Sequence, residues 1–341
     1  MKIEENILLQ KFTTLRTGGP ARYFVRVKTI SDLKNALIFA KEKELSFFVL
    51  GGGANILILD EGYSGLVIKM EMKGVEIKNT KNALYRVTAS AGNIWDAFIA
   101  LTVKNKLVGL ENLSLIPGTV GAAVFGNIGA YGVETKETVF SVEAFNTETM
   151  KIKKFSRKKC SFGYRESFFK TKEGKKYIIT RVTFSLKKNG KVKINYKDVR
   201  EFFEKKKNIS PFQKDVRNAI IKIREEKLPD ISLIGTAGSF FKNPVVSEET
   251  AVSLKKEYPD IPIFLQKDTK VKIPAGFLLD KVCGFKGYKK GKVGTWGNQA
   301  LVLVNYGGAN AKDILEFAEM MKAGVKEKTG IDLEYEVQIL K

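Results

Sequence analysis

The sequence predicts an α+β protein, with α/β units in the first part of the chain and a separate α+β region in the last third. Its first seventy residues alternate strand-like and helix-like stretches. A polar, lysine-rich region from about 186 to 217 has little apolar periodicity and contains the expected domain boundary. With 341 residues, of which 44% are hydrophobic, the chain is long enough for two or three domains and a sizeable core without disulfides.

Short-range patterns predict the elements of the first hundred residues. Residues 31–43 predict a helix, because apolar side chains recur there at helical spacing after Ser31, a possible N-cap. Residues 47–50 are expected to form a buried strand, followed by a glycine turn and a second apolar run to Leu59. Residues 94–104 predict a second helix by the same spacing.

The last third of the chain shows one clear helix and one clear strand pattern. Residues 314–325 place their apolar side chains on one helical face, and Gly330 follows as the expected C-cap. Residues 333–340 alternate apolar and polar side chains, which predicts a strand. The carboxylates of Glu334 and Glu336 then lie on the same polar face of that strand.

Charge and composition exclude several classes of protein. Fifty-nine Lys and Arg against 37 Asp and Glu give a formal net charge of +22, which attracts anions. Nucleic acid is one such anion, but the bases are scattered along the whole chain and no nucleic-acid-binding signature accompanies them. The N-terminal residues lack the basic start of a signal peptide, and no apolar run approaches the ~18 residues of a membrane span. A cytoplasmic protein is therefore expected.

The absence of histidine restricts the chemistry further. It excludes Ser-His triads, histidine-ligated metals and histidine general acids, so proton transfer must use Ser, Tyr, Lys, Cys or a carboxylic acid. Cys160 and Cys283 are too few for a disulfide framework and lack the spacing of a zinc site, which fits a reducing compartment. No metal site is expected.

Two glycine-rich loops are candidates for binding an anionic ligand. In the first, Leu50 ends an apolar run and a glycine turn follows, made of Gly51, Gly52, Gly53, Ala54 and Asn55. Glycines let successive backbone N–H groups approach phosphate oxygens, so the loop is either a diphosphate cradle or simply a tight turn between strands. It matches neither the GxGxxG fingerprint nor the Walker loop.

The second loop concentrates small residues between Pro117 and Gly132. Such density indicates backbone packed against a flat, extended ligand, and the alternative is a close-packed cluster of turns. The candidate ligand-binding positions are Pro117, Gly118, Thr119, Gly121, Ala122, Asn127, Ile128, Gly129, Ala130, Tyr131 and Gly132.

Together the two loops resemble the FAD-binding region of the superfamily that includes vanillyl-alcohol oxidase and p-cresol methylhydroxylase. The resemblance implies α/β FAD-binding subdomains of the p-cresol methylhydroxylase type, followed by an α+β substrate domain. Members of this superfamily often attach flavin covalently through His, Cys or Tyr. Because this chain has no histidine and neither cysteine lies in the loops, FAD is expected to bind non-covalently.

Four further segments resemble one family within that superfamily, the UDP-N-acetylenolpyruvoylglucosamine reductases. They are Thr14–Ala21, Tyr164–Lys170, Gly235–Pro244 and Leu333–Val337, and they occur in the family's order along nearly the whole chain. The resemblance implies that Arg165, Ser239 and Glu336 are catalytic. Taken singly, each has an ordinary explanation: an ion-pair partner, a turn residue and a solvated strand face.

The same resemblance implies a set of substrate-binding residues. They are Tyr164, Arg165, Tyr196, Lys227, Gly238, Ser239, Asn243, Lys286, Gln299 and Glu336. Tyr196, in a polar Asn-Tyr-Lys-Asp segment, indicates the subtype in which a mobile loop closes over the substrate diphosphate. Phe264 is a departure, because a tyrosine is expected there, and its missing hydroxyl removes a hydrogen bond to the diphosphate that Lys227 and Lys286 could replace.

The reaction implied is the NADPH-dependent, FAD-mediated reduction of UDP-N-acetylglucosamine enolpyruvate to UDP-N-acetylmuramate, a peptidoglycan precursor. The expected domains are residues 1–70, joined by a C-terminal strand at about 331–341, then 71–210 for the rest of the FAD site and 211–330 for substrate. A monomer is expected, with no nucleic-acid, membrane or obligate protein partner. The alternatives are another FAD oxidase or dehydrogenase acting on a hydroxy acid or sugar, and a basic nucleic-acid-binding protein.

Overall fold

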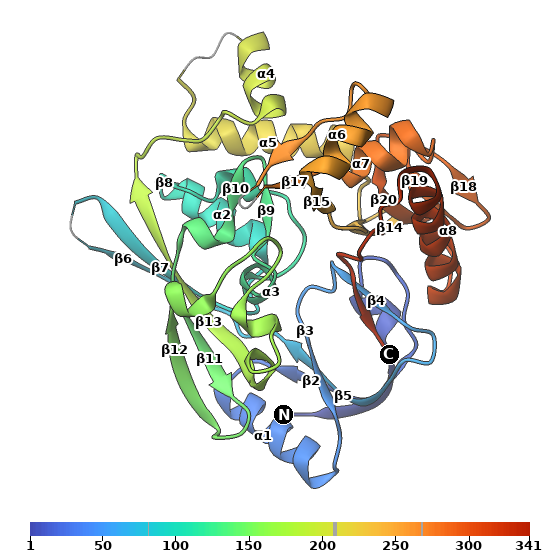
Figure 1. The fold of residues 1–341 in the computed structure, drawn as a ribbon. Coiled ribbons are helices and arrows are strands. Elements are labelled where there is room, and N and C mark those ends of the chain that lie inside the picture. Colours follow the sequence, from blue (N-terminus) through green and yellow to red (C-terminus); the bar gives the residue numbers. More distant parts are fainter. Residues whose placement is uncertain (81, 207–209, 267–268) are drawn as a thin grey trace. The chain divides into compact units, whose positions relative to one another are not determined.

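The computed structural model describes residues 1–80, 82–206, 210–266 and 269–341, in which helices and strands alternate along the chain (Figure 1). The predicted α+β class is confirmed. The chain divides into two compact units. Unit 1 is Met1–Ile7, Ala21–Gly52 and Ser64–Arg224, and unit 2 is Leu8–Pro20, Gly53–Tyr63 and Glu225–Lys341.

The elements of unit 1 come mostly from the first two thirds of the chain. They are β1 (Ile3–Leu8), β2 (Pro20–Val27), α1 (Ile30–Glu42), β3 (Phe47–Leu50), β5 (Tyr63–Met70), β6 (Val75–Asn79), β7 (Leu84–Ser90), α2 (Trp95–Lys104), β8 (Leu107–Val108), α3 (Val120–Phe125), β9 (Gly129–Ala130), β10 (Val133–Glu134), β11 (Val139–Asn146), β12 (Lys151–Ser156), β13 (Tyr177–Lys188), α4 (Lys197–Lys205) and most of α5 (Gln213–Lys227). Short 3-10 turns lie at Glu111–Leu113, Thr135–Glu137, Lys158–Cys160, Phe168–Lys170 and Gly174–Lys176.

The first sheet of unit 1 has the order β1-β2-β5-β3. β3 and β5 pair in parallel, with Phe47 opposite Leu66, so the first glycine loop leaves the sheet directly after β3. The strand predicted to be buried is only partly so, because Leu50 is buried while Phe47, Phe48 and Val49 are partly exposed. Helix α1 matches the predicted helix, but its N-cap is Thr29 rather than Ser31. The Thr29 side chain accepts the Asp32 N–H while the Asp32 carboxylate accepts the Thr29 N–H, and this capping box satisfies two otherwise unpaired donors.

The second sheet of unit 1 has the order β12-β11-β13-β7-β6, with β8 paired to β13 (Figure 1). The strands β11 and β13 are antiparallel, as are β13 and β7. Trp95 and Phe98 of α2 pack against Phe184 of β13, with ring centroids 5.1 to 6.1 Å apart. These rings are almost completely buried and form the centre of a core that supports the second glycine loop.

The region predicted as a polar boundary contains α4 and the start of α5. Val199 and Phe203 of α4 pack against Val216, Ala219 and Ile220 of α5 in one small core. The apolar spacing is helical, but many lysines between these positions hide it in the sequence. The statement that residues 186 to 217 have little apolar periodicity therefore missed the helical spacing in α4 and at the start of α5.

An ion pair fixes α5 to α2 within unit 1. Arg217 donates from both terminal nitrogens to the Asp96 carboxylate, at 2.6 and 2.8 Å, and the Leu115 N–H donates to Asp96 at 2.5 Å. Burial by itself raises the pKa of Asp96, but the hydrogen bonds from Arg217 and Leu115 and the charge of Arg217 outweigh it, so the pKa lies below its ordinary value. Leu115 lies just before the second glycine loop, so the pair also anchors that loop.

Replacing Arg217 with methionine is expected to lower the free energy of unfolding by about 2–3 kcal/mol at neutral pH, somewhat less than for a fully buried pair. The Asp96 contribution is fully present above the unfolded pKa of about 3.9 and disappears as pH falls through the lower folded pKa. The difference in free energy of unfolding between wild type and variant, measured by urea unfolding, should therefore shrink below about pH 4.

Arg200→Met is the control, since the ion pair of Arg200 with Glu204 is exposed and should contribute less than about 1 kcal/mol. An equal loss of stability in both variants would contradict the role of the Asp96 pair.

Unit 2 contains β4 (Ile56–Ile58), β14 (Gly235–Ser239), β15 (Val245–Ser247), α6 (Glu248–Glu257), β16 (Phe264–Leu265), β17 (Lys270–Lys272), α7 (Ala275–Phe277), β18 (Lys289–Lys290), β19 (Val293–Trp296), β20 (Gln299–Asn305), α8 (Ala311–Thr329) and β21 (Gln338–Leu340). A 3-10 turn at Leu9–Phe12 and a π-helical turn at Leu278–Val282 complete it. Its sheets have the orders β14-β20-β19-β18, β15-β17-β16 and β21-β4.

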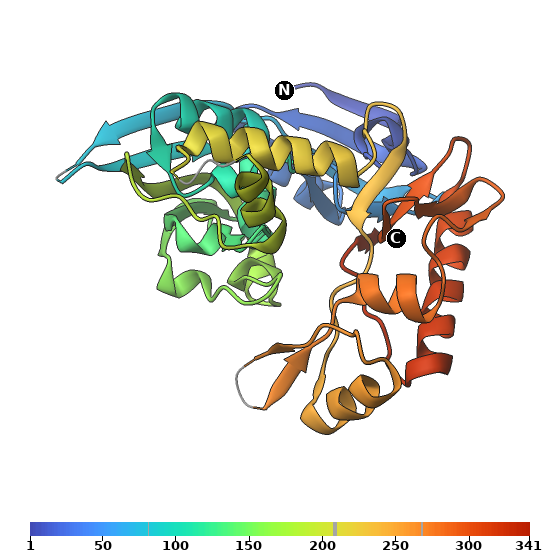
Figure 2. The same ribbon diagram turned by 90° about the horizontal axis from the view of Figure 1, so that it is seen from above.

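Helix α8 packs against β19 and β20 (Figure 2). It begins with a capping box between Asn310 and Asp313 and ends at Gly330, whose φ of 69° is the left-handed conformation expected of a glycine C-cap. The predicted C-terminal strand is shorter than expected. Regular strand covers only Gln338–Leu340, which pair in parallel with β4. Residues 333–337 form no regular strand, but they make a bridge from Tyr335 to Phe241 and backbone hydrogen bonds from Glu336 to Phe240 and from Lys242 to Glu334.

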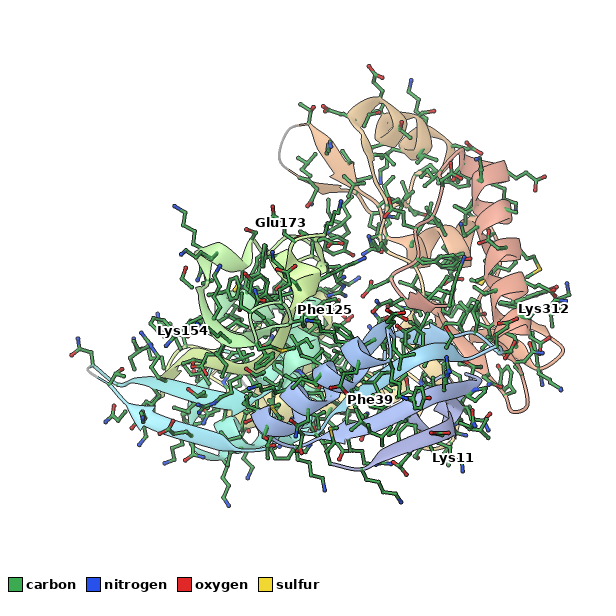
Figure 3. The ribbon with its side chains drawn as sticks, turned by 90° about the horizontal axis from the view of Figure 1, so that it is seen from below. Lys11, Phe39, Phe125, Lys154, Glu173 and Lys312 are labelled. Atoms are coloured by element: carbon green, nitrogen blue, oxygen red, sulfur yellow. The ribbon has the colours of Figure 1, made fainter. Side chains whose placement is uncertain are left out.

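The lysines and arginines are distributed over both units. Lys11, Lys154 and Lys312, labelled in Figure 3, are exposed and belong to widely separated parts of the chain. This agrees with the scattered charge of the sequence. No helix in the described part of the chain is long and apolar enough to span a membrane.

Candidate active site

The first glycine loop cannot accommodate side chains. A Cβ added to Gly52 would lie 2.5 Å from the Gly118 Cα, and one added to Gly51 would lie 2.9 Å from the Thr119 Oγ1. Gly53 has a φ of +66°, and its Cβ would meet the Phe12 carbonyl oxygen at 1.9 Å. Within unit 1, the two glycine loops predicted from the sequence are therefore in direct backbone contact.

The loop also offers hydrogen-bond donors. Across the described residues, the backbone N–H groups of Gly52, Gly53 and Ala54 donate to no acceptor of the chain. Successive unengaged N–H groups on a glycine turn form the kind of concave donor surface that binds phosphate. The residues thus fit the diphosphate of FAD. Asn55 differs, because its side chain donates to the Glu336 carbonyl oxygen at 3.1 Å.

The second loop combines tightly packed and exposed small residues. A Cβ on Gly121 would lie 2.8 Å from the Ala91 Cβ, whereas Ala122, in the same short helix α3, is exposed. Asn127 is fully buried; its side chain donates to the Gly163 carbonyl at 2.7 Å and accepts the Lys136 N–H at 3.0 Å. Asn127 therefore fixes the loop to Gly163, the residue before the Tyr164–Lys170 segment.

Arg165 lies beside this loop in unit 1. Its backbone is left-handed, with a φ of 56°, and its Nη1 donates to the Gly129 carbonyl at 3.0 Å. Lys170 donates to the Arg165 carbonyl at 2.6 Å, and the Tyr164 ring centroid lies 5.7 Å from the guanidinium carbon. The structure thus brings a half-buried guanidinium against the glycine-rich backbone, in a conformation that contacts on both sides hold in place.

Tyr131 and Tyr196 form a pair in unit 1, with ring centroids 5.5 Å apart in an edge-to-face arrangement. Tyr196 is the N-cap residue of α4, and its side chain is about half exposed. Tyr131 is hydrogen-bonded to Arg224 of α5, and burial raises the pKa of the Tyr131 hydroxyl. Sequence reasoning missed Arg224; its only signal was its place seven residues after Arg217, on the same face of α5.

Ser239 and Glu336 come together in unit 2. Ser239 ends β14 opposite Val302, after an irregularity at Gly238, whose φ is +74°. The next residue, Phe240, accepts the Glu336 N–H at 2.9 Å. The Glu336 carbonyl in turn accepts a hydrogen bond from the Asn55 side chain, so the segments Gly235–Pro244 and Leu333–Val337 and the end of the first glycine loop meet at one place in unit 2.

Three other predicted substrate-binding residues of unit 2 have partners within it. Asn243 accepts the Ala275 N–H at 3.0 Å, and Gln299 accepts the Leu301 N–H at 3.3 Å. Lys286 forms a 3.7 Å ion pair with Asp280. Lys227, the last residue of α5, is exposed, and Phe264 of β16 is 51% exposed.

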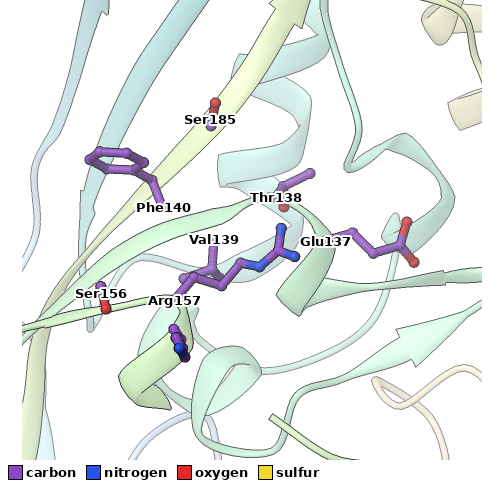
Figure 4. Close-up of a pocket in the computed structure, with 8 residues that line it drawn as sticks. Glu137, Thr138, Val139, Phe140, Ser156, Arg157 and Ser185 are labelled. Carbon is purple, nitrogen blue, oxygen red and sulfur yellow. The ribbon is translucent and has the colours of Figure 1, made fainter. Parts of the chain in front are cut away.

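None of these residues lines either of two cavities in the described part of the chain. One, of about 480 Å³, is in unit 1 and is lined by residues that include Phe140, Arg157 and Ser185 (Figure 4). The other, in unit 2, is lined by residues that include Tyr258, Phe277 and Lys281. Neither contains a predicted site residue. No group of His, Cys, Asp or Glu side chains in the described chain could hold a metal ion.

Comparison with known proteins places these features in a class and then in a family. Residues 21–154 match the family model of an FAD-binding domain, and residues 229–340 match that of the UDP-N-acetylenolpyruvoylglucosamine reductase C-terminal domain. The fold and the glycine loops thus define an FAD-dependent oxidoreductase, which confirms the expected cofactor. The chain belongs to the UDP-N-acetylenolpyruvoylglucosamine reductase family.

Full-length relatives support that membership. The reductase of Flavobacterium johnsoniae is 40% identical over 341 residues and covers 100% of both chains. That of Pseudomonas aeruginosa is 40% identical over 336 residues, or 98% of each chain. The crystal structure of the reductase from Thermus caldophilus matches with a TM-score of 0.70 and 27% identity over 100% of both chains. The family resemblance predicted from the sequence motifs is confirmed.

Proposed function

We propose that this protein reduces UDP-N-acetylglucosamine enolpyruvate to UDP-N-acetylmuramate in peptidoglycan precursor synthesis, with FAD as cofactor and NADPH as hydride donor. The observation that carries the proposal is the full-length match to reductases of this name, at 40% identity over 341 residues. The fixed positions of Arg165 against the second glycine loop and of Glu336 beside Phe240, in the Gly235–Pro244 segment, support it. The choice of NADPH over NADH is part of the proposal.

FAD supplies hydride transfer when it is bound. Leu50 and the two glycine loops would hold it, the first loop through the N–H groups of Gly52 to Ala54 and the second through the small residues around Ala122. The absence of histidine and the position of Cys160 and Cys283 outside the loops predict that FAD bound in this way has no covalent link to the protein.

The roles of the three catalytic residues follow from where charge develops. Hydride addition to the vinyl carbon leaves negative charge on the adjacent carbon and its carboxylate, so a fixed cation there lowers the barrier. Arg165 would bind that carboxylate, because its guanidinium can form two parallel hydrogen bonds. Ser239 would donate the proton to carbon, and Glu336 would orient donors around the enolate. Serine is a weak acid, so this role requires a strongly basic acceptor and neighbouring cations.

The remaining predicted residues would bind the UDP-sugar. Tyr164, Tyr196, Lys227, Gly238, Asn243, Lys286 and Gln299 offer hydroxyl, ammonium, amide and backbone groups for a diphosphate, a sugar and a uracil ring. Phe264 offers only its ring at the position where a tyrosine was expected. The three-domain division, the monomeric state and the cytoplasmic location also remain predictions.

One experiment tests the reaction as a whole. The purified protein is reduced anaerobically with NADPH, and UDP-N-acetylglucosamine enolpyruvate is added while the flavin absorbance is followed. Rapid reoxidation with formation of UDP-N-acetylmuramate is expected, and UDP-N-acetylglucosamine, which lacks the vinyl group, serves as the control. Reduction without reoxidation would indicate another substrate, and a colourless protein that does not take up FAD would overturn the proposal.

Acid precipitation checks the mode of FAD attachment. Trichloroacetic acid should release all of the yellow colour into the supernatant, because a non-covalent cofactor dissociates when the protein unfolds. The supernatant spectrum measures the released flavin. Colour that stays in the pellet would show a covalent bond and exclude this prediction.

A further inference from the structure

A lysine of the first sheet contacts the first glycine loop. Lys69 of β5 lies opposite Leu50 of β3 in the parallel register, and its half-buried ammonium donates to the Gly51 carbonyl oxygen. Burial lowers the pKa of Lys69, while the nearby Glu71 carboxylate acts in the opposite direction. The chain therefore places a partly desolvated cation directly at the start of the loop assigned to the FAD diphosphate.

Because the peptide bond is planar, the contact between Lys69 and the Gly51 carbonyl also fixes the direction of the Gly52 N–H. In a trans peptide, the C=O and N–H groups of the same unit point in opposite directions. Lys69 holds the Gly51 carbonyl on its own side, so the N–H of the same peptide unit, which belongs to Gly52, must point to the other side. That N–H donates to no acceptor in the described chain. A hydrogen bond to the carbonyl also polarises the N–H of the same unit and makes it a stronger donor.

A second lysine, Lys73, also donates to a glycine carbonyl, but it orients no N–H group toward a ligand. Lys73 donates to the Gly92 carbonyl. The carbonyls on either side of it, of Ala91 and Asn93, accept the N–H groups of Gly121 and Val120, each at 2.9 Å. The N–H of the Gly92–Asn93 peptide unit is already used, because Asn93 donates to the Ser90 carbonyl at 3.1 Å. Lys73 thus supports a turn but leaves no donor for a ligand.

We propose that Lys69 is a positioning residue for the FAD diphosphate, which it serves by holding the Gly51–Gly52 peptide so that the Gly52 N–H faces the phosphates. The inference rests on the proposed role of the first glycine loop. It adds a residue to the cofactor site that lies outside both glycine-rich loops and all four family motifs.

The test compares ligands that contain different parts of FAD. Apoprotein of the wild type, Lys69→Met, Lys69→Arg and Lys73→Met is titrated with FAD, with ADP, which carries the diphosphate, and with riboflavin, which carries only the flavin. Lys69→Met should weaken FAD and ADP by about tenfold to a hundredfold, the effect of losing a charge-assisted hydrogen bond, and leave riboflavin unchanged. Lys69→Arg should recover most of the affinity, and Lys73→Met should bind all three ligands like the wild type.

Other outcomes overturn the inference in distinguishable ways. Lys69 would be purely structural if Lys69→Met lowered the affinity for all three ligands equally and also lowered the melting temperature of the apoprotein, with no recovery in Lys69→Arg. Unchanged FAD and ADP affinity in Lys69→Met would remove the role of Lys69 and leave the loop assignment intact. If ADP failed to compete with FAD in the wild type, the loop assignment itself would be wrong.

Discussion

Replacing Ser239 with alanine should slow the reoxidation of reduced flavin by UDP-N-acetylglucosamine enolpyruvate by ~10²- to 10⁴-fold, the usual contribution of a general acid. Reduction of the flavin by NADPH should stay nearly unchanged, because the proton from Ser239 is needed only after hydride has reached the substrate. Stopped-flow absorbance measures the two half-reactions separately. Ser239 lies at the end of β14, next to Phe240, which accepts the Glu336 N–H.

The control for this prediction is Ser253→Ala, an exposed position in α6 of the same unit. It should leave both half-reactions at wild-type rates. If Ser239→Ala slowed flavin reduction as much as reoxidation, Ser239 would act in binding or structure rather than as the acid. Melting temperatures of both variants, with FAD bound, identify any general loss of stability.

Replacing Arg165 with methionine should lower kcat/KM for the enolpyruvyl substrate by about 10²- to 10³-fold, the effect of removing one preorganised donor at the developing charge. Methionine keeps much of the apolar length but removes both the charge and the donor to Gly129. Lysine at this position should recover only part of the rate, because an ammonium cannot form two parallel hydrogen bonds with a carboxylate. Steady-state kinetics at varied substrate concentration measure the effect.

Arg157→Met is the matched control, since Arg157 is exposed and precedes Arg165 by eight residues. Its kcat/KM should equal that of the wild type. A loss in Arg165→Met that also appeared as weaker FAD binding would mean that the arginine acts by shaping the second glycine loop through Gly129. Retention of full kcat/KM would exclude a catalytic role.

Several elements could be predicted from local sequence because the deciding contacts are local. Helix α8 was expected from its apolar spacing, and Gly330 from the left-handed conformation that ends a helix. The start of α1 was misplaced by two residues, since Thr29 and Ser31 are both good N-caps and only the pairing with Asp32 decides between them. Helix α4 was missed because its two buried residues stand among charged ones.

The candidate site was predicted in its parts rather than in its connections. The glycine loops are visible in the sequence from their density of small residues, whereas Arg165, Ser239 and Glu336 could be singled out only through the resemblance of their segments to the reductase family. The contact between Asn55 and Glu336 joins residues 281 positions apart, and no local pattern indicates it. The same holds for the Arg224 contact with Tyr131.

By itself, the sequence determined the fold class, the family, the need for FAD and the residue types available for proton transfer. The fold class depends on periodicity and the available residue types on composition, whereas the family and FAD follow from the resemblance of short motifs to those of known reductases. The tertiary structure alone decided that Lys69 meets the Gly51 carbonyl and that Asp96 meets Arg217. Lysine and arginine side chains are long and flexible, and in this chain they are numerous, so only the packing of distant strands and helices selects the few that contact the loops.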